Sequence, residues 1–374
     1  MSEAGRIKRE SDLLRDWFAA RGAVPVECDI LQPAETLLDL YGEEIRARAY
    51  VTQDPARGEM MLRPDFTVPV TEMHIARDVE RAHYTYAGKV FRRQEEHPER
   101  DSEYFQVGYE IFDRADPPPA GARAPEAADP VSDDAEVFAL FAEVLDPYKL
   151  RAVTGDIGIL TAAVHGLETS ERRKAALLRH IWRPRRFRAL LDRYSGRTPP
   201  PPSRLALLGG GDPMAEAGAE IGLRGPDEIA ARIASLQADA EEGPLCRSQV
   251  QLIDAVLAVR ETCSFALEHL HDIAVDLPAL AGAVARFERR CDALAARGVD
   301  VARLDFEASY GRTSMEYYDG FVFGFLAPAR PDLPPVATGG RYDALTRILG
   351  GGREVPAVGG VIRPGLLLEL ESRG

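Results

Sequence analysis

Cysteine is scarce in this sequence, and long apolar runs are absent from it. The 374 residues include four cysteines, which are Cys28, Cys246, Cys263 and Cys291. They are far apart in the sequence and form no closely spaced pair of the kind that binds a metal ion. No apolar stretch is long enough to cross a bilayer, and residues 1–10 lack the apolar core of a signal peptide. We therefore expect a cytoplasmic protein with reduced thiols, no metal site and no membrane contact.

Sequence motifs of several enzyme classes are also missing. There is no nucleophile elbow, no Walker A loop and no dinucleotide-binding fingerprint, and the seven histidines lack the spacing of a zinc protease. The net charge of -14 weighs mildly against a role in holding long nucleic acids, which usually bind basic surfaces. The composition, with 45% apolar and 28% charged residues, is ordinary for a soluble globular protein. The length allows a large core and two structural units.

The sequence between residues 84 and 113 predicts two strands joined by a polar loop, and the chain is organised around them. The apolar face of the second strand consists of Phe105, Val107, Tyr109 and Ile111. Its other face carries Gln106 and Glu110, about 13 Å apart along the strand, and Gly108 between them leaves space on the sheet. This face is either a polar bracket for a small zwitterion or a solvated surface, and the strand pattern alone favours the solvated surface.

Hydrophobic periodicity predicts helices and strands on both sides of this hairpin. Helices are expected near residues 8–21, 67–81, 133–145, 158–167 and 279–297. Asp133 is expected to cap the third of these helices. Strands are expected near residues 46–52, 59–62, 150–154, 301–306 and 357–362. The sequence from Gly339 to Asp343 is expected to open a helix that ends near Leu349.

The character of the chain changes between residues 168 and 255. This stretch contains a basic run at 179–188, four consecutive prolines from Pro199 to Pro202, and alanine-rich helical segments. We expect a helical insertion at 168–255 that separates a first part of the core, 1–167, from a second part, 256–374. The basic run either holds phosphate or a partner, or forms a solvated helix surface, and we favour the solvated surface.

Three separated stretches resemble class II histidyl-tRNA synthetases. The sequence Phe91-Arg92 with Phe105–Glu110 is similar to motif 2 of that family. The sequence Glu316-Tyr317-Tyr318, followed by Gly339–Asp343, resembles its second histidine-specific segment, and Arg63–Thr67 resembles the turn that holds the ammonium of the amino acid. The resemblance covers nearly the whole chain. It implies an α+β fold, with a class II aminoacyl-tRNA synthetase-like antiparallel sheet flanked by helices, and a homodimer with Leu31–Pro33 at its motif 1 interface.

The resemblance also implies a pocket for free histidine. Its residues would be Asp65, Thr67 and Gln106 at the ammonium, Glu110 and Tyr318 at the imidazole, Arg92 at the carboxylate, and Tyr317 in the wall. A zwitterion needs anionic groups at one end and a guanidinium at the other, and a carboxylate favours a ring N–H donor. No catalytic residue and no cofactor is expected in this chain.

The chain departs from the synthetases where they carry out ATP chemistry. Thr313 stands at the position of one family arginine, with Arg312 displaced by one residue. Leu366 stands at the position of the motif 3 arginine, and Arg363 is out of register with it. Gln94 replaces a motif 2 glutamate. Since one preorganised donor is worth about a hundredfold or more in rate, losing two such cations would remove several powers of ten in adenylation.

No anticodon-binding domain is expected after motif 3, and the chain then resembles the family of ATP phosphoribosyltransferase regulatory subunits. This resemblance implies a non-catalytic subunit that binds histidine as a feedback signal. It would activate a short catalytic subunit in a hetero-oligomer, in the first step of histidine biosynthesis, without a tRNA partner. One alternative is a truncated histidyl-tRNA synthetase-like ligase that still forms histidyl-adenylate. Another is a histidine sensor unrelated to biosynthesis.

Overall fold

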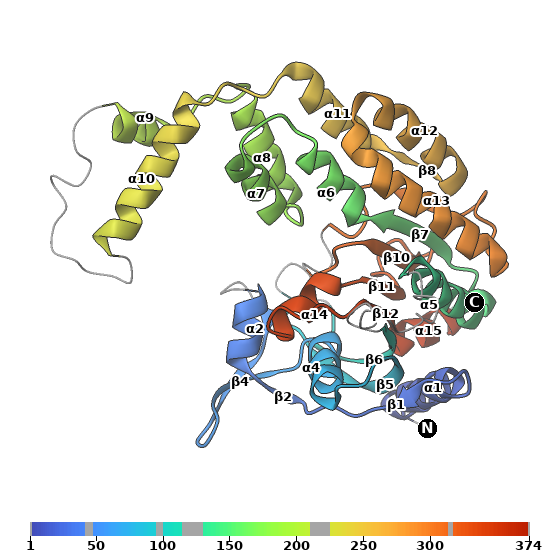
Figure 1. Ribbon diagram of the computed structural model, residues 1–374. Coiled ribbons are helices and arrows are strands. Elements are labelled where there is room, and N and C mark those ends of the chain that lie inside the picture. Colours follow the sequence, from blue (N-terminus) through green and yellow to red (C-terminus); the bar gives the residue numbers. More distant parts are fainter. Residues whose placement is uncertain are drawn as a thin grey trace, which may run out of the picture.

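The computed structural model describes residues 2–41, 48–94, 100–113, 130–209, 225–312 and 317–372. Its centre is a nine-stranded sheet with the order β1-β5-β6-β12-β11-β10-β7-β9-β8 (Figure 1). In this order the strands are Val24–Pro25, Ala82–Phe91, Glu103–Phe112, Ala357–Ile362, Ala337–Arg341, Phe321–Leu326, Arg151–Asp156, Asp305–Glu307 and Arg260–Thr262. Neighbouring strands run antiparallel except in the pairs β1–β5 and β7–β9. The predicted α+β architecture, a mainly antiparallel sheet flanked by helices, is confirmed.

Helices α1 (Glu3–Ala19) and α5 (Pro130–Leu145) pack against one face of this sheet. The ring of Phe18 in α1 lies 5.2 Å from the ring of Tyr109 in β6 and 5.5 Å from the ring of Phe141 in α5. Tyr109 belongs to the predicted apolar face of the hairpin. This face therefore forms the core beneath the two helices.

The predicted hairpin is present, because β5 and β6 pair antiparallel along their whole length. Gln106 and Glu110 project from β6 to the face opposite Tyr109. Each of them is only 1% exposed. On the other edge of β6, strand β12 places Gly359 directly beside Glu110. The polar face is thus part of the interior, and its interpretation as a solvated surface is wrong.

Further elements lie around the main sheet. Helices α4 (Thr67–Arg77) and α14 (Asp343–Leu349) pack against each other, and α15 (Pro364–Glu371) packs on α1 and β6. A small sheet has the order β2-β4-β3, with strands Leu31–Pro33, Gly58–Leu62 and Val51–Asp54, and α2 (Ala34–Tyr41) lies against it. Helices α6 (Ile157–His165), α12 (Cys263–Asp276) and α13 (Ala281–Ala296) lie near β7, β8 and β9 (Figure 1).

All elements that the structure describes between residues 171 and 258 are helices. They are Glu171–Arg179 (α7), Pro184–Tyr194 (α8), Pro202–Leu208 (α9), Pro226–Glu241 (α10) and Arg247–Ala258 (α11). Helices α9 and α10 lie away from the main sheet (Figure 1). Within the basic run, Arg185 and Arg186 are exposed whereas Ile181 and Phe187 are buried. The basic run therefore contains exposed arginines as well as buried apolar residues that hold it on the protein.

Some predicted element boundaries are wrong. Helix α1 begins at Glu3 instead of near residue 8, and β3 begins at Val51 instead of near residue 46; residues 42–47 lie outside the described part of the chain. Asp133 does not cap α5, because the helix already begins at Pro130. Its carboxylate instead forms an ion pair of 2.7 Å with Arg81. Asp133 therefore forms an ion pair with a residue distant in the sequence, although the local sequence predicts a helix cap.

The two glycines before Arg341 lie in strand β11 and not at the start of a helix. A Cβ atom at Gly339 would lie 2.3 Å from the ring of Phe323, and one at Gly340 would lie 2.7 Å from a backbone oxygen of Phe321. Glycine is therefore required here by close packing within the sheet. Helix α14 follows only at Asp343.

Candidate functional site

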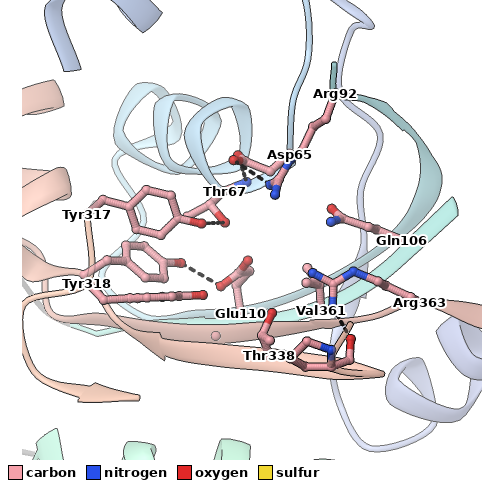
Figure 2. A pocket seen from close by; sticks show the side chains of 14 residues that line it. Asp65, Thr67, Arg92, Gln106, Glu110, Tyr317, Tyr318, Thr338, Val361 and Arg363 are labelled. Carbon is pink, nitrogen blue, oxygen red and sulfur yellow. Dashed lines mark hydrogen bonds and ion pairs between the residues drawn. The ribbon is translucent and has the colours of Figure 1, made fainter. Parts of the chain in front are cut away.

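A pocket with a volume of about 150 Å³ lies on the polar face of the main sheet (Figure 2). It is lined by Asp65, Thr67, Arg92, Gln106, Glu110, Tyr317, Tyr318, Pro335, Thr338, Tyr342, Gly359, Gly360, Val361 and Arg363. All seven residues that the sequence analysis selected are among them. They come from the start of α4, from the hairpin and from the segment before β10, so the fold brings together three separated stretches of the chain.

The Glu110 carboxylate lies at the base of this pocket. Its Oε1 atom accepts a hydrogen bond from the hydroxyl of Tyr86, and its Oε2 atom accepts one from the hydroxyl of Tyr342, both at 2.7 Å. Burial raises the pKa of Glu110 to about 7, and the two tyrosine hydrogen bonds oppose that rise. A ligand that offers an N–H donor or a positive charge would favour the ionised form.

Glycines make room for this carboxylate and its partners. A Cβ atom at Gly359 would lie 1.5 Å from Oε2 of Glu110. A Cβ atom at Gly108 would lie 2.1 Å from the ring of Tyr86. The space that Gly108 leaves is therefore filled by a tyrosine that binds Glu110. The prediction that this glycine opens floor space for a ligand is wrong.

Asp65 and Thr67 form a second polar corner at the start of α4. Asp65 is 3% exposed, and its Oδ1 atom accepts a hydrogen bond from the backbone N–H of Thr67 at 3.2 Å. The Tyr317 hydroxyl donates a hydrogen bond to Oγ1 of Thr67 at 3.3 Å. Burial raises the pKa of Asp65, and the charge of Arg92 opposes this. Arg92 lies 3.4 Å from Asp65 and donates from Nε to the backbone oxygen of Pro64 at 2.7 Å. Its guanidinium is therefore directed toward the aspartate.

Gln106 has a side-chain amide that the described protein leaves unsatisfied. Both Nε2 and Oε1 are buried, and neither has a hydrogen-bond partner among the described residues. The amide faces the pocket between Arg92 and Arg363 (Figure 2). A buried polar group without a partner costs on the order of 1–3 kcal/mol. The site thus offers one donor and one acceptor to a bound molecule.

Tyr317 and Tyr318 close the side of the pocket opposite Gln106 and Arg363 (Figure 2). Their rings meet edge to face with centroids 4.9 Å apart. Burial first and the Glu110 charge second raise the pKa of Tyr318, so its hydroxyl stays protonated. The backbone oxygen of Tyr318 accepts a hydrogen bond from the indole N–H of Trp182 at 3.1 Å. The pocket wall is thus tied to the loop between α7 and α8.

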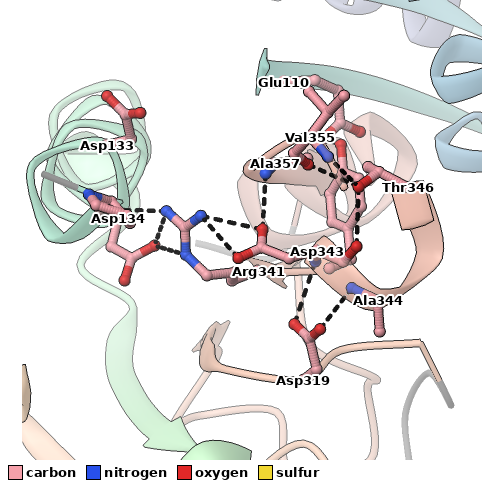
Figure 3. A network of polar contacts seen from close by, with 12 residues as sticks. Glu110, Asp133, Asp134, Asp319, Arg341, Asp343, Ala344, Thr346, Val355 and Ala357 are labelled. Carbon is pink, nitrogen blue, oxygen red and sulfur yellow. Dashed lines mark hydrogen bonds and ion pairs between the residues drawn. The ribbon is translucent and has the colours of Figure 1, made fainter. Parts of the chain in front are cut away.

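A buried ion network lies beside the start of α14, and Figure 3 shows its residues Asp134, Arg341 and Asp343. Asp134 in α5 pairs with Arg290 at 2.9 Å and with Arg341 at 2.7 Å. Arg290 also pairs with Asp156 at 2.8 Å, and Arg341 with Asp343 at 3.1 Å. Breaking such a pair leaves a buried charge uncompensated. The network therefore fixes β11 and the start of α14, between which Tyr342 lies.

Asp319 links this network to the tyrosine pair. Its carboxylate accepts the backbone N–H groups of Asp343 at 3.2 Å and Ala344 at 2.6 Å (Figure 3). Burial and the nearby Asp343 charge raise its pKa to about 7. Asp319 directly follows Tyr318 in the chain. Its hydrogen bonds to the start of α14 therefore hold the backbone next to the tyrosine pair in place.

The residues at which the sequence departs from the synthetases occupy different places. Arg312 is buried, donates from Nε to the backbone oxygen of Ile181 at 2.7 Å, and does not line the pocket. Thr313 lies outside the described residues. Leu366 lies in α15 and does not line the pocket, whereas Arg363 does. No role was predicted for Arg363, Tyr342 or Thr338, because the resemblance carried none at these positions.

The described residues contain no group of three or more His, Cys, Asp and Glu side chains placed to hold a metal ion. No helix in the described part of the chain is long and apolar enough to cross a membrane.

Comparison with known proteins defines the class of this fold. The sequence model described as histidyl-tRNA synthetase matches residues 1–238 and 227–364. A solved structure titled ATP phosphoribosyltransferase regulatory subunit/histidyl-tRNA synthetase, from Bacillus halodurans C, superposes with a TM-score of 0.66 at 18% identity, covering 99% of this chain and 80% of that one. Histidyl-tRNA synthetase from Nostoc sp. PCC 7120 gives 0.64 at 17% identity, covering 100% and 73%. The fold is that of the class II histidyl-tRNA synthetases.

Curated relatives narrow this class to one family. The chain is 30% identical over 362 residues to the ATP phosphoribosyltransferase regulatory subunit of Brucella ovis, covering 92% of this chain and 93% of the relative. The regulatory subunit of Brucella abortus is also 30% identical, covering 92% of both chains. The chain belongs to the ATP phosphoribosyltransferase regulatory subunit family.

The raised pKa of Glu110 predicts a pH-dependent stability of the ligand-free protein. Between its ordinary pKa of 4.5 and about 7 in the fold, the native state binds more protons than the unfolded state, so the free energy of unfolding falls as pH rises. Glu110→Gln removes this contribution. In urea unfolding, the free energy of unfolding of the variant should rise by about 2 kcal/mol relative to that of the wild type between about pH 5 and pH 8. Asp319 contributes equally to both proteins, and a difference that is constant with pH would contradict the assignment.

Proposed function

We propose that this protein is a regulatory subunit of ATP phosphoribosyltransferase without catalysis of its own, and that its pocket binds free histidine. Its membership of the regulatory subunit family supports the first part. The observation that carries the second part is the unsatisfied amide of Gln106 inside a pocket that also contains Glu110 and Asp65. These groups together match a small ligand that has hydrogen-bond donors at two ends and also a hydrogen-bond acceptor.

Histidine fits this requirement group by group. Its ring N–H would donate to Glu110, with Tyr318 beside the imidazole and Tyr317 in the pocket wall. Its ammonium would lie at Asp65 and Thr67, where the buried carboxylate has Arg92 as its cationic neighbour. A buried carboxylate that receives charged hydrogen bonds is stabilised in its ionised form. The ligand would therefore supply these groups with further hydrogen-bond donors and a positive charge.

The proposed role is feedback control of the first step of histidine biosynthesis. The chain would activate a short catalytic subunit in a hetero-oligomer, and histidine would shift the assembly by binding one of its states more tightly. Two copies would pair through the class II core with Leu31–Pro33 at the interface. Residues 168–255 would form an insertion between core segments 1–167 and 256–374. No role for tRNA or a cofactor is proposed.

A histidyl-tRNA synthetase-like ligase that forms histidyl-adenylate is the second candidate, because Arg92 and Arg363 both line the pocket and adenylation needs cations near the reacting phosphate. Histidine-dependent exchange of labelled pyrophosphate into ATP separates the two functions. The regulatory proposal predicts no exchange above background with the pure protein. Clear exchange that depends on histidine would establish the ligase instead.

Histidine should stabilise the protein, and Glu110 should carry much of the specificity. At a hundredfold excess over Kd, a ligand of the native state adds about 2.7 kcal/mol to the free energy of unfolding, so the melting temperature should rise by several degrees. Glu110→Gln should weaken histidine binding about 10- to 100-fold, because the ring loses a charged acceptor.

Glu136→Gln is a matched control for this measurement. Glu136 also accepts a tyrosine hydrogen bond, from Tyr109 at 3.2 Å, but it lies on α5 and does not line the pocket. Its histidine affinity, measured by calorimetry, should equal that of the wild type. No melting shift in saturating histidine, or equal affinities of the two variants, would refute the pocket assignment.

A further inference from the structure

Arg363 contributes a guanidinium to the pocket from the end of β12. In the ladder between β12 and β6, Ile362 pairs with Val107, so the next residue, Arg363, comes beside Gln106. The guanidinium lies across the pocket from Tyr317 and Tyr318, next to the Gln106 amide (Figure 2). Its Nη1 atom donates to the backbone oxygen of Pro335. This bond and a hydrogen bond with the Tyr104 side chain orient the group, and other guanidinium N–H donors remain for a ligand.

The charge of Arg363 has no carboxylate neighbour among the described residues that would neutralise it. Burial lowers its pKa, Arg92 lowers it further, and the neighbours that act in the opposite direction are Tyr104 and Tyr310. By contrast, the buried Arg290 and Arg341 each lie between two carboxylates. Arg363 is half-buried, and a charge that is removed from water is costly unless an anion joins it.

Arg92 is less suited to take an anion from the ligand. Its guanidinium is 3.4 Å from Asp65 and also donates to the backbone oxygen of Pro64. A ligand carboxylate at Arg92 would therefore lie close to the Asp65 carboxylate and be repelled by it. At Arg363 the neighbouring polar group is the Gln106 amide, whose unsatisfied Nε2 can donate to the same anion while Oε1 accepts from an ammonium.

We infer that Arg363, together with the Gln106 amide, binds the ionised carboxylate of the ligand and makes the pocket selective for free α-amino acids. This inference rests on the proposed function, and it moves the carboxylate from Arg92 to Arg363. Guanidinium and carboxylate match as a planar, bidentate pair. A ligand that carries an alcohol or amide in place of the carboxylate loses this pair and leaves the Arg363 charge uncompensated. The pocket thereby distinguishes histidine from its reduced or amidated forms.

A thermodynamic cycle tests the inference by removing each partner separately. Calorimetry would compare histidine with histidinol and histidinamide on the wild type, Arg363→Gln and Arg363→Lys. The wild type should bind histidine about 100-fold more tightly than histidinol, because charged hydrogen bonds are at stake. Arg363→Gln should lose about that factor for histidine and change histidinol affinity by less than about threefold, so that the preference disappears. Arg363→Lys should restore part of it.

Two controls keep the outcomes distinct. Arg347→Gln removes a largely exposed arginine that pairs with Glu354 at 2.9 Å outside the pocket, and it should preserve the full preference for histidine. Unfolding of each variant without ligand establishes that it is folded. An equal loss for all three ligands in Arg363→Gln, or an unchanged histidine-to-histidinol ratio, overturns the role of Arg363 and leaves the proposed function standing. Failure of the wild type to bind histidine overturns both.

Discussion

The carboxylate of Glu110 is buried in the middle of the main sheet, and the neighbouring strands are shaped around it. Gly359 leaves the space that the carboxylate occupies, and Gly108 leaves the space for Tyr86, one of its two hydroxyl donors. The second donor, Tyr342, follows Arg341, which the buried ion network holds against Asp134. A carboxyl group in such a place is kept near its titration point by burial. Its protonation is therefore open to control by whatever enters the pocket.

The pocket is also connected to the helices that extend from the core. Trp182 donates to the backbone of Tyr318, and Arg312 donates to the backbone of Ile181 while its guanidinium lies 4.9 Å from the ring of Phe187 in α8. These contacts join the tyrosine wall to the base of the basic run, whose Arg185 faces solvent. The pocket wall and that surface are therefore joined by a continuous series of packed side chains and hydrogen bonds.

Much of the site was predictable from the sequence, because three short segments carried it. The resemblance of the hairpin and of the segments around Asp65 and Tyr317 to histidyl-tRNA synthetases selected seven residues that line one pocket. The pattern of a single strand did not predict that its polar face is buried, since burial depends on α4, β10 and β11. The glycine at position 339 was interpreted as part of a helix start. Its actual reason is the tertiary contact with Phe323, which leaves no room for a side chain and cannot be seen in the sequence. No role was predicted for Arg363, because it is out of register with the motif 3 arginine of the synthetases. Its place in the pocket follows from the pairing of β12 with β6, which the sequence does not reveal.

Phosphoribosyl transfer by a short catalytic subunit, measured with this chain and with its Glu110→Gln variant, shows whether histidine acts through this pocket. Both forms should activate the catalytic subunit, because Glu110 is buried inside the pocket and away from the surface. Histidine should then inhibit the complex that contains the wild type, and should require about 10- to 100-fold higher concentrations with the variant. Equal inhibition of both complexes would contradict the account, because histidine would then act at another site.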